Sequence, residues 1–413
     1  MNSIENEMFE NLKKYNQNHI IKYYEKLDET QKNKLQEQIM NIDLKQIADL
    51  YENTKKEISF EDIVIEPIDF VDKKALSEEE LNKYNEIGSK IIKEGKYAVV
   101  TMAGGQGTRL GHKGPKGTFF LGLENDKSIF EILTDNLKYN NKKFGVVIPW
   151  YIMTSRENNY ETEQFFKENN YFDYDPNSII FFKQGELPMC SEDGKLLIDE
   201  TGLIKEAADG HGGIFESLRK NNVIEDMEKR GVEWIFIGPV DNVLAKMVDE
   251  TLVGVTAAKN VLAGGKSVVK AEPKEKVGVF CKRNKKPGVV EYTEITQELS
   301  EARNENGDLV FAESHINCNL FNLKVIKEIS KNKLPYHSAH KKAKFIDEEG
   351  NLVVPESPNA YKFESFIFDA FEKLEDMAIL RVKREEEFAP VKNAEGNDSP
   401  ETARKLYKDF MNL

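Results

Sequence analysis

The sequence contains little cysteine, and what it has is scattered along the chain. Its three cysteines are Cys190, Cys281 and Cys318, an odd number with no Cys-x-x-Cys pair and no zinc-ligand spacing. This pattern argues against a disulfide-stapled scaffold and against a cysteine zinc site. We expect buried free thiols, which suit a reducing compartment without demanding one.

Long apolar runs are also missing. No segment approaches the roughly 18 consecutive apolar residues that a membrane span requires. The N-terminus is polar and acidic, whereas a secretory signal would be basic and then apolar. We therefore expect a cytoplasmic protein with no membrane partner.

Positive charge is in deficit. The 58 lysines and arginines are outnumbered by 72 aspartates and glutamates, which gives a formal net charge of −14. Such a chain repels nucleic acid at long range, and no basic tract is long enough to reverse that. We expect no nucleic-acid partner, and a polyphosphate ligand would need a local cationic pocket. The 413 residues, 39% of them hydrophobic, are enough to bury a substantial core and to form two or three structural units.

The first part of the chain has helical periodicity. Apolar residues recur at helical spacing from Phe9 to about Tyr51, which predicts an antiparallel helical cap. A further helix should begin after Ser77, whose hydroxyl can cap it, and end near Glu94 with Gly95 as the stop. No catalytic constellation precedes Gly95.

Beyond Gly95, short apolar strands alternate with helices and glycine-rich turns. This alternation predicts an α/β fold with a mainly parallel sheet, helices on both faces and a later β-rich excursion with hairpins. The expected strands are Tyr97–Met102, Gly145–Met153, Ile179–Phe182, Trp234–Val240, Ser267–Ala271, Val277–Cys281, Val289–Tyr292 and Ala378–Val382, and the later helices are Phe363–Lys373 and Pro400–Leu413. We expect a helical cap at residues 1–95, a catalytic core at 96–380 and a small C-terminal lobe at 381–413.

The most informative segment is a glycine-rich loop directly after the first of these strands. It reads Ala103-Gly-Gly-Gln-Gly-Thr-Arg-Leu-Gly111 and is followed by Gly114-Pro-Lys-Gly117. Glycines let backbone amides approach a ligand closely, and open α/β sheets bind ligands at the carboxyl ends of their strands. Arg109 adds a permanently charged fork and Lys116 a mobile point charge. The segment therefore predicts a triphosphate-binding loop.

Other interpretations of the glycines are weaker. A tight strand-to-helix turn would explain the glycines but not the two cations. The spacing of Gly105, Gly107 and Gly111 fits a dinucleotide-binding loop, yet no acid follows at the end of a second strand. A Walker A loop is excluded because no glycine-lysine-Ser/Thr triplet ends the segment.

These residues closely resemble the UTP-dependent sugar-1-phosphate uridylyltransferases, especially the UDP-N-acetylhexosamine pyrophosphorylases. The likeness covers nearly the whole chain, because blocks such as Asp209-Gly-His-Gly-Gly213, Val240-Asp-Asn242 and Tyr361-Lys-Phe-Glu364 occur in family order. The resemblance implies a nucleotide-diphosphosugar transferase core, which is a Rossmann-like mixed sheet, with an N-terminal helical cap and a small C-terminal lobe. It implies UTP and a sugar 1-phosphate as substrates.

The resemblance also implies residue roles. It places Gln184 on the uracil edge, Gly210 beneath the base and Asp241 on Mg²⁺, a hard cation that takes few protein ligands. From the sequence alone, Gln184 could equally be a turn amide and Asp241 a helix cap. The full expected set comprises catalytic Arg109, Lys116 and Lys392, nucleotide contacts from Ala103, Gly104, Gly105, Gln106, Gly107, Lys116, Gln184, Gly210, Asp241 and Lys362, and sugar contacts from His211, Glu291, Tyr292, His315 and Lys392.

Two histidines depart from the hexosamine pattern. His211 and His315 stand where those enzymes carry amide-bearing asparagines, and His211 is similar to the Gly-His-Gly of the glucose 1-phosphate enzymes. Both could instead be core histidines. We expect N-acetylglucosamine 1-phosphate as the substrate, with glucose 1-phosphate as the alternative. A nicotinamide-dependent oxidoreductase and a non-catalytic nucleotide sensor remain open as other classes.

Overall fold

The computed structural model describes residues 3–56 and 63–412, which form two compact units. The smaller unit consists of the described residues of Met1–Ser59, Gly185–Gly213 and Leu334–Phe366. The larger unit consists of the described residues of Phe60–Gln184, Ile214–Lys333 and Ile367–Leu413. The boundaries predicted from the sequence at residues 95 and 380 stay predictions.

The smaller unit combines helices from the start of the chain with short sheets from two later segments. Its elements are α1 (Ser3–Lys14), α2 (Asn18–Glu25), α3 (Glu29–Asn41), α4 (Leu44–Thr54), β6 (Glu186–Pro188), β7 (Cys190–Ser191), β8 (Glu206–Ala208), β14 (His337–Lys341), β15 (Phe345–Ile346), β16 (Leu352–Val353) and β17 (Ala360–Glu364). The Gln38 carboxamide ties α3 to the later segment, since it donates to the Ile204 carbonyl at 2.8 Å and accepts from the Ile204 amide at 2.7 Å. Leu12, Ile20 and Phe363 share one buried core.

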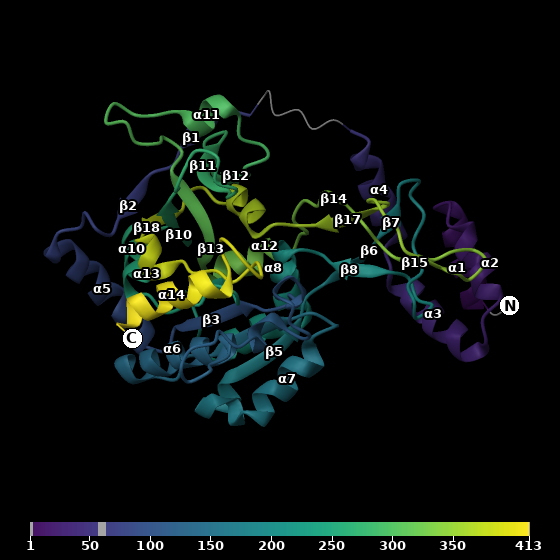
Figure 1. Ribbon diagram of the computed structural model, residues 1–413, viewed down its shortest axis with the longest axis horizontal. Coiled ribbons are helices and arrows are strands. Elements are labelled where there is room, and N and C mark those ends of the chain that lie inside the picture. The colour runs from purple at the N-terminus through teal and green to yellow at the C-terminus, as the bar shows by residue number, and fades with distance from the viewer. Residues whose placement is uncertain (1–2, 57–62, 413) are drawn as a thin grey trace. The chain divides into compact units, whose positions relative to one another are not determined.

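The larger unit is built on one twisted sheet. Its main path runs β2 (Phe70–Asp72), β18 (Ala378–Arg381), β10 (Ala263–Val269), β13 (Glu313–Asn322), β9 (Trp234–Pro239), β3 (Tyr97–Met102), β4 (Trp150–Thr154) and β5 (Ile179–Lys183) (Figure 1). Among these described strands β13 runs antiparallel to both neighbours, and the others run parallel to theirs. The predicted mixed α/β sheet is confirmed.

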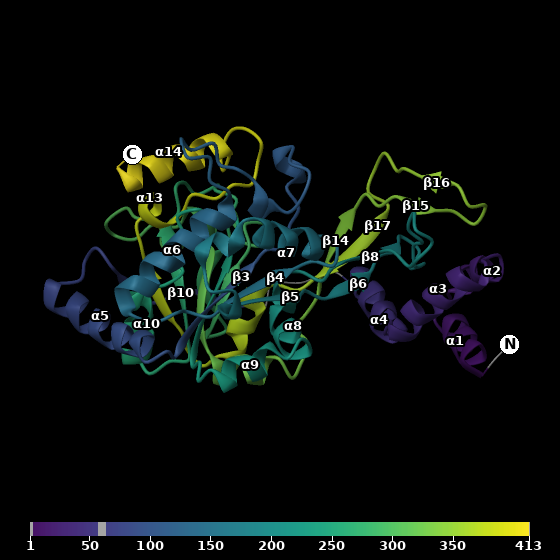
Figure 2. The same cartoon turned by 90° about the horizontal axis from the view of Figure 1, so that it is seen from below.

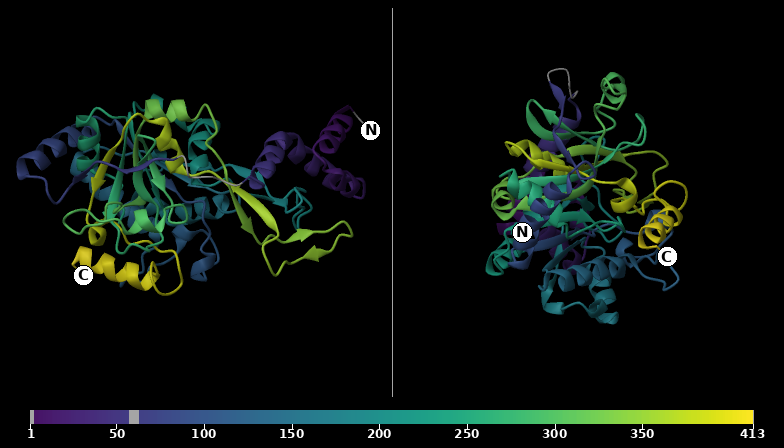
Figure 3. Two further views of the ribbon diagram at one scale, coloured as in Figure 1. Left: turned by 90° about the horizontal axis from the view of Figure 1, so that it is seen from above. Right: turned by 90° about the vertical axis from the view of Figure 1, so that its left-hand side faces the viewer.

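Helices cover both faces of this sheet. α6 (Ile129–Phe144) and α7 (Asn159–Glu168) lie along one side of β3, β4 and β5, and α8 (Ile214–Lys220) and α9 (Val223–Lys229) lie along the other (Figure 2). The arrangement follows from right-handed crossovers, because the chain moves outward from β3 to β5 and then returns to β9. The remaining helices of the unit are α5 (Glu78–Lys93), α10 (Glu250–Ala258), α11 (Gln297–Glu301), α12 (Leu323–Ile329), α13 (Arg384–Glu387) and α14 (Pro400–Met411), the last on the surface of the unit (Figure 3).

Helix caps and buried apolar runs in the sequence predicted the bounds of several elements correctly. The Ser77 hydroxyl accepts from the Glu80 amide, so α5 begins as predicted, and Gly95 ends it with a φ of +72°. All six residues of β3 are buried. The β-rich excursion is confirmed as an antiparallel hairpin of β11 (Val279–Arg283) and β12 (Lys286–Val290), with β1 (Ile65–Pro67) paired to β11.

Several predicted strands were shifted in their bounds. Those expected at Ser267–Ala271, Val277–Cys281 and Val289–Tyr292 are β10, β11 and β12, at Ala263–Val269, Val279–Arg283 and Lys286–Val290. Two further departures are larger. The strand expected from Gly145 begins only at Trp150, because Gly145 is the left-handed C-cap of α6 with a φ of +70°. The helix expected over Phe363–Lys373 is instead the end of β17 followed by a 3₁₀ segment at Ile367–Lys373. Phe363 fills the core from a strand paired with β14.

The cysteines match the expectation from the sequence. All three cysteines are free and buried, and burial raises the pKa of the Cys281 thiol to about 12. Within residues 3–56 and 63–412, no helix has both the length and the apolar content needed to cross a bilayer.

Candidate active site

Four parallel strands of the larger unit end at one edge of its sheet. The register pairs Met102 with Pro239 on one side and with Met153 on the other, and Met153 with Phe182. The residues that follow these strands therefore meet at the same edge. They are the glycine loop after β3, Gln184 after β5 and Asp241 after β9. This edge is where open α/β sheets bind ligands.

The glycine loop folds back on itself like a small hairpin. The Gly107 amide donates to the Gly114 carbonyl at 2.9 Å, and the Lys116 amide donates to the Gly105 carbonyl at 3.0 Å. Gly111 and Gly114 make this turn possible with φ values of +70° and +129°, which side chains rarely adopt. The fold returns Lys116 to the end of β3.

The returning lysine meets the predicted metal ligand. The Lys116 Nζ donates to the Asp241 Oδ2 at 3.1 Å, and the two side chains are 17% and 18% exposed. Arg109 lies in the 3₁₀ turn Thr108–Leu110 and is exposed, and within residues 3–56 and 63–412 its guanidinium makes no ion pair. The structure thus brings two of the predicted site residues into contact and leaves a second cation on the loop facing solvent.

The first glycine of the loop packs against the predicted base-reading amide. A Cβ built on Gly104 would lie 2.6 Å from the Gln184 Oε1, so no larger residue fits without displacing that carboxamide. The Gln106 Oε1 is buried and accepts no hydrogen bond from any described residue. Both observations fit a loop shaped around a ligand.

One residue that supports the loop was missed by sequence reasoning. Asn158 is fully buried, and its Nδ2 donates to the Ala103 carbonyl at 3.0 Å and the Gly105 carbonyl at 3.4 Å. Its Oδ1 accepts from the Ser155 amide at 2.8 Å. The only signal in the sequence is a Ser-x-x-Asn spacing directly after β4, which is indistinguishable from an ordinary helix cap.

Two of the predicted sugar contacts lie around one glycine. A Cβ on Gly278 would meet the Glu291 Oε1 at 2.8 Å, and the Gly278 carbonyl accepts from the His315 amide at 2.9 Å. The His315 Nε2 lies 3.0 Å from the Asn319 Oδ1, and its ring meets Phe280 edge-on at 4.8 Å. Tyr292 is 46% exposed. Glu291 and His315 are therefore close in space, and contacts with Asn319 and Phe280 fix the imidazole.

Lys392 follows a segment that is bonded to Asp241. The Val391 amide donates to the Asp241 carbonyl at 2.9 Å. The Lys392 Nζ lies 3.6 Å from the Asp398 Oδ2, and its amide donates to the Asp398 carbonyl at 2.7 Å. The predicted sugar-phosphate lysine and the predicted metal ligand are thus joined through the backbone.

Three predicted residues belong to the smaller unit. Gly210 has a φ of +86°, and a Cβ on it would lie 2.3 Å from the Ser365 carbonyl oxygen. The neighbouring His211 ring lies 5.5 Å from that of Phe366. Lys362, on β17, donates to the Glu364 Oε1 at 2.8 Å. The smaller unit brings Gly210 and His211 against the turn that follows Lys362.

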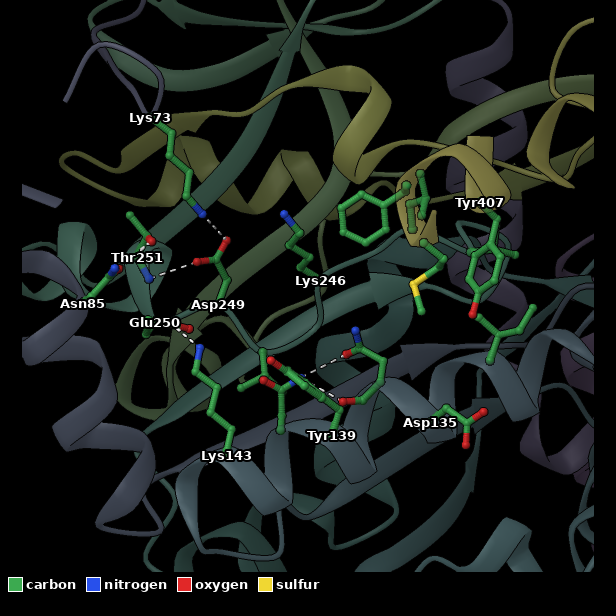
Figure 4. Close-up of a pocket in the computed structure, with 18 of the residues that line it drawn as sticks. Lys73, Asn85, Asp135, Tyr139, Lys143, Lys246, Asp249, Glu250, Thr251 and Tyr407 are labelled. Atoms are coloured by element: carbon green, nitrogen blue, oxygen red, sulfur yellow. Dashed lines mark hydrogen bonds and ion pairs between the residues drawn. The ribbon is translucent and has the colours of Figure 1, made fainter. Parts of the chain in front are cut away.

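A separate cavity of about 550 Å³ lies between α5, α6, α10 and α14 of the larger unit (Figure 4). Two of its labelled lysines point towards acids, Lys73 towards Asp249 and Lys143 towards Glu250. No predicted site residue lines it. We therefore place the candidate active site at the strand ends and not in this cavity.

Comparison with known proteins identifies the family. Residues 44–398 match the UTP–glucose-1-phosphate uridylyltransferase family. The human UDP-N-acetylhexosamine pyrophosphorylase-like protein 1 is 38% identical over 78% of this chain, which spans about two thirds (66%) of that protein. UDP-N-acetylglucosamine diphosphorylase 2 of Arabidopsis thaliana is 36% identical over 97% of this chain and 82% of its own length.

A solved structure agrees with the sequence match. The uridine diphosphate N-acetylglucosamine pyrophosphorylase of Trypanosoma brucei superposes with a TM-score of 0.83 at 28% identity, over 98% of this chain and 84% of that one. The structural match and the sequence matches therefore point to the same family. The chain belongs to the UTP–glucose-1-phosphate uridylyltransferase family.

Proposed function

We propose that the protein is a uridylyltransferase that joins UTP to N-acetylglucosamine 1-phosphate and releases pyrophosphate. Family membership supports the reaction type, and the names of the human and Arabidopsis relatives support the N-acetylated sugar. The single observation that carries the proposal is the Lys116–Asp241 pair at the strand ends, beside a glycine loop with an unpaired Arg109 among the described residues. A cytoplasmic location, suggested by composition, is part of the proposal.

Uridylyl transfer depends on charge neutralisation more than on acid–base catalysis. A sugar 1-phosphate is largely dianionic at neutral pH, since its second pKa lies near ~6, so its oxygen can attack the α-phosphorus without a general base. Arg109 and Lys116 would balance the charge that develops on the leaving pyrophosphate. Lys392 would hold the sugar phosphate in line with the phosphorus.

The residues present fit a magnesium ion that is held mainly by the substrate. Asp241 offers one partly exposed carboxylate, and the described residues contain no group of three or more His, Cys, Asp or Glu that could form a dedicated cage. Mg²⁺ typically binds through one or two carboxylates plus substrate phosphates and water. Bound on Asp241, it would supply Lewis-acid neutralisation of phosphate oxygens.

Because Lys116 pairs with Asp241, we expect Mg²⁺ binding at Asp241 to depend on bound nucleotide. Its ammonium already neutralises Asp241 at 3.1 Å, so the carboxylate should bind Mg²⁺ weakly alone. A triphosphate would draw Lys116 towards itself and free Asp241. Calorimetric titration with Mg²⁺ should show weak binding to the protein without UTP, and at least tenfold tighter binding to the protein–UTP complex than to UTP in buffer. Equal affinity for the complex and for UTP in buffer would contradict this assignment.

A pyrophosphate-release assay tests the reaction. Purified protein should release pyrophosphate from UTP only when a sugar 1-phosphate and a divalent metal are both present, and should run in reverse from UDP-sugar and pyrophosphate. Undiminished turnover in excess chelator would refute the metal role. Release of pyrophosphate without a sugar acceptor would refute the transferase role.

Glucose 1-phosphate is the second candidate substrate. The family is described by UTP–glucose-1-phosphate uridylyltransferase, and His211 fits the glycine-histidine-glycine pattern of the glucose enzymes. Comparing kcat/KM for the 1-phosphates of N-acetylglucosamine, N-acetylgalactosamine, glucose and galactose separates the two. A tenfold or greater preference for glucose 1-phosphate would replace the sugar assignment and leave the uridylyltransferase proposal standing.

A further inference from the structure

Two stretches far apart in the sequence run side by side behind the Lys116–Asp241 pair. The first is residues 241–244, shortly after β9, and the second is residues 387–392, which begin at the last residue of α13. They pair as an antiparallel bridge at Asn242 and Pro390. The Val243 amide donates to the Ala389 carbonyl at 3.2 Å, and the Val391 amide to the Asp241 carbonyl at 2.9 Å. Asp241 and Lys392 therefore stand at one end of the paired stretches.

Asn242 closes this pairing with its side chain. It is fully buried. Its Nδ2 donates to the Glu387 carbonyl at 2.8 Å, and its Oδ1 accepts from the Ala389 amide at 2.9 Å and from the Leu244 amide at 3.3 Å. One carboxamide thus satisfies polar backbone groups of both stretches, as a buried amide must.

An ion-pair network anchors the far end of the second stretch to the sheet. Lys266 on β10 is 0% exposed, and its Nζ lies 2.5 Å from the Glu387 Oε2 and 2.8 Å from the Asp249 Oδ2. Burial alone would lower the pKa of Lys266, but the carboxylates of Asp249 and Glu387 outweigh it and raise that pKa above its ordinary value. Lys73 reaches the Asp249 carboxylate from the surface (Figure 4), and Lys246 reaches that of Glu387. A buried pair of this kind fixes geometry because breaking it leaves an uncompensated charge.

We propose that Asn242 is a positioning residue which fixes Lys392 relative to Asp241, so that the sugar phosphate and the nucleotide are presented at a set distance. The inference rests on the proposed function. Asn242 is buried behind Asp241, so it acts through the register of the two stretches and not through contact with a substrate. In-line transfer is sensitive to this register, because a misplacement of about 1 Å can cost about 10²-fold in rate.

The first test replaces Asn242 and follows both kinetics and the backbone. Asn242→Ala should lower kcat/KM for the sugar 1-phosphate by about tenfold to a hundredfold. Backbone amides of residues 387–392 should exchange hydrogen for deuterium faster in this variant. Asn140→Ala is the matched control, because Asn140 is a 5% exposed asparagine whose amide donates within α6, to the Asn136 carbonyl at 2.8 Å. The control should change neither quantity.

A double-mutant cycle separates positioning from general loss of structure. If Asn242 acts through Lys392, adding Asn242→Ala to Lys392→Ala should cost less than about twofold further, whereas adding it to Arg109→Ala should multiply the two losses. Asn242→Asp covers the case in which the alanine variant does not fold. Its carboxylate can still accept from the Ala389 amide but cannot donate to the Glu387 carbonyl, so kcat/KM should fall in this variant too.

The outcomes are distinct. Multiplicative losses with Lys392→Ala, or unchanged exchange at residues 387–392 in Asn242→Ala, would overturn the positioning role while the uridylyltransferase proposal stands. A wild-type protein that releases no pyrophosphate with any of the four sugar 1-phosphates would overturn both.

Discussion

Replacing Lys116 by alanine removes the ammonium that lies 3.1 Å from the Asp241 carboxylate. In the protein without substrate the loss should be small, because both side chains are partly exposed and such pairs contribute about 1 kcal/mol or less. In the transition state the same charge faces the departing pyrophosphate in a preorganised loop. A charge of that kind is worth about 3 kcal/mol, or roughly 10²-fold in kcat. We expect kcat to fall at least that far with little change in stability.

The assay follows pyrophosphate release at saturating UTP, N-acetylglucosamine 1-phosphate and Mg²⁺, together with thermal unfolding and circular dichroism. Lys113→Ala is the matched control, because Lys113 is an exposed lysine on the same loop. It should keep kcat within about twofold of wild type, since an exposed charge away from the pair contributes little. Near-normal kcat in a folded Lys116→Ala protein, or an equal loss in both variants, would remove Lys116 from the catalytic role.

Arg109→Ala should also lower kcat by at least ~10²-fold, and a folded variant with normal kcat would remove Arg109 from the site. Gly104→Ala should raise KM for UTP more than it lowers kcat, because its Cβ would lie 2.6 Å from the Gln184 Oε1; an unchanged KM would contradict the base-reading role of Gln184. Burial alone would raise the pKa of Asp249, but Lys266 holds it well below its ordinary value, so the stability it contributes is present at neutral pH and is lost as the pH falls below about 4. Urea unfolding between neutral pH and pH values below about 4 should show a free energy of unfolding that depends less on pH in Asp249→Asn than in wild type. The same pH dependence in both proteins would contradict the ion pair. The double variant His211→Asn with His315→Asn should raise the kcat/KM ratio of N-acetylglucosamine to glucose 1-phosphate, and an unchanged ratio would show that neither histidine reads the sugar.

The parts of the fold that the sequence predicted well are those decided by neighbouring residues. Ser77 and Glu80 form a capping box within one helical turn, and Gly95 ends the same helix. β3 is a run of six apolar or small residues that is buried on both faces, as a central parallel strand should be. Family membership was also predictable, because the glycine loop and the later blocks match in order.

Prediction failed where the secondary structure or the role of a residue depends on partners far away in the sequence. Phe363 and its neighbours carry an apolar pattern that fits a helix, but pairing with β14 makes Ala360–Glu364 a strand. Asn158 and Asn242 look like turn residues in the sequence. Their roles depend on carbonyls 55 and 145 positions away, respectively, and neither partner is signalled by composition or spacing.

The acidic net charge and the anionic substrates are reconciled by how the predicted phosphate-binding lysines are held. Lys116 pairs with Asp241, Lys362 with Glu364 and Lys392 with Asp398. A free lysine loses up to about 2 kcal/mol of side-chain entropy when a ligand orders it. A lysine already held by a partly exposed carboxylate has lost part of that freedom beforehand, and the pair it gives up is weak. Carboxylates beside a phosphate site can therefore favour binding by ordering its cations, provided that each lysine can turn to the phosphate as it arrives.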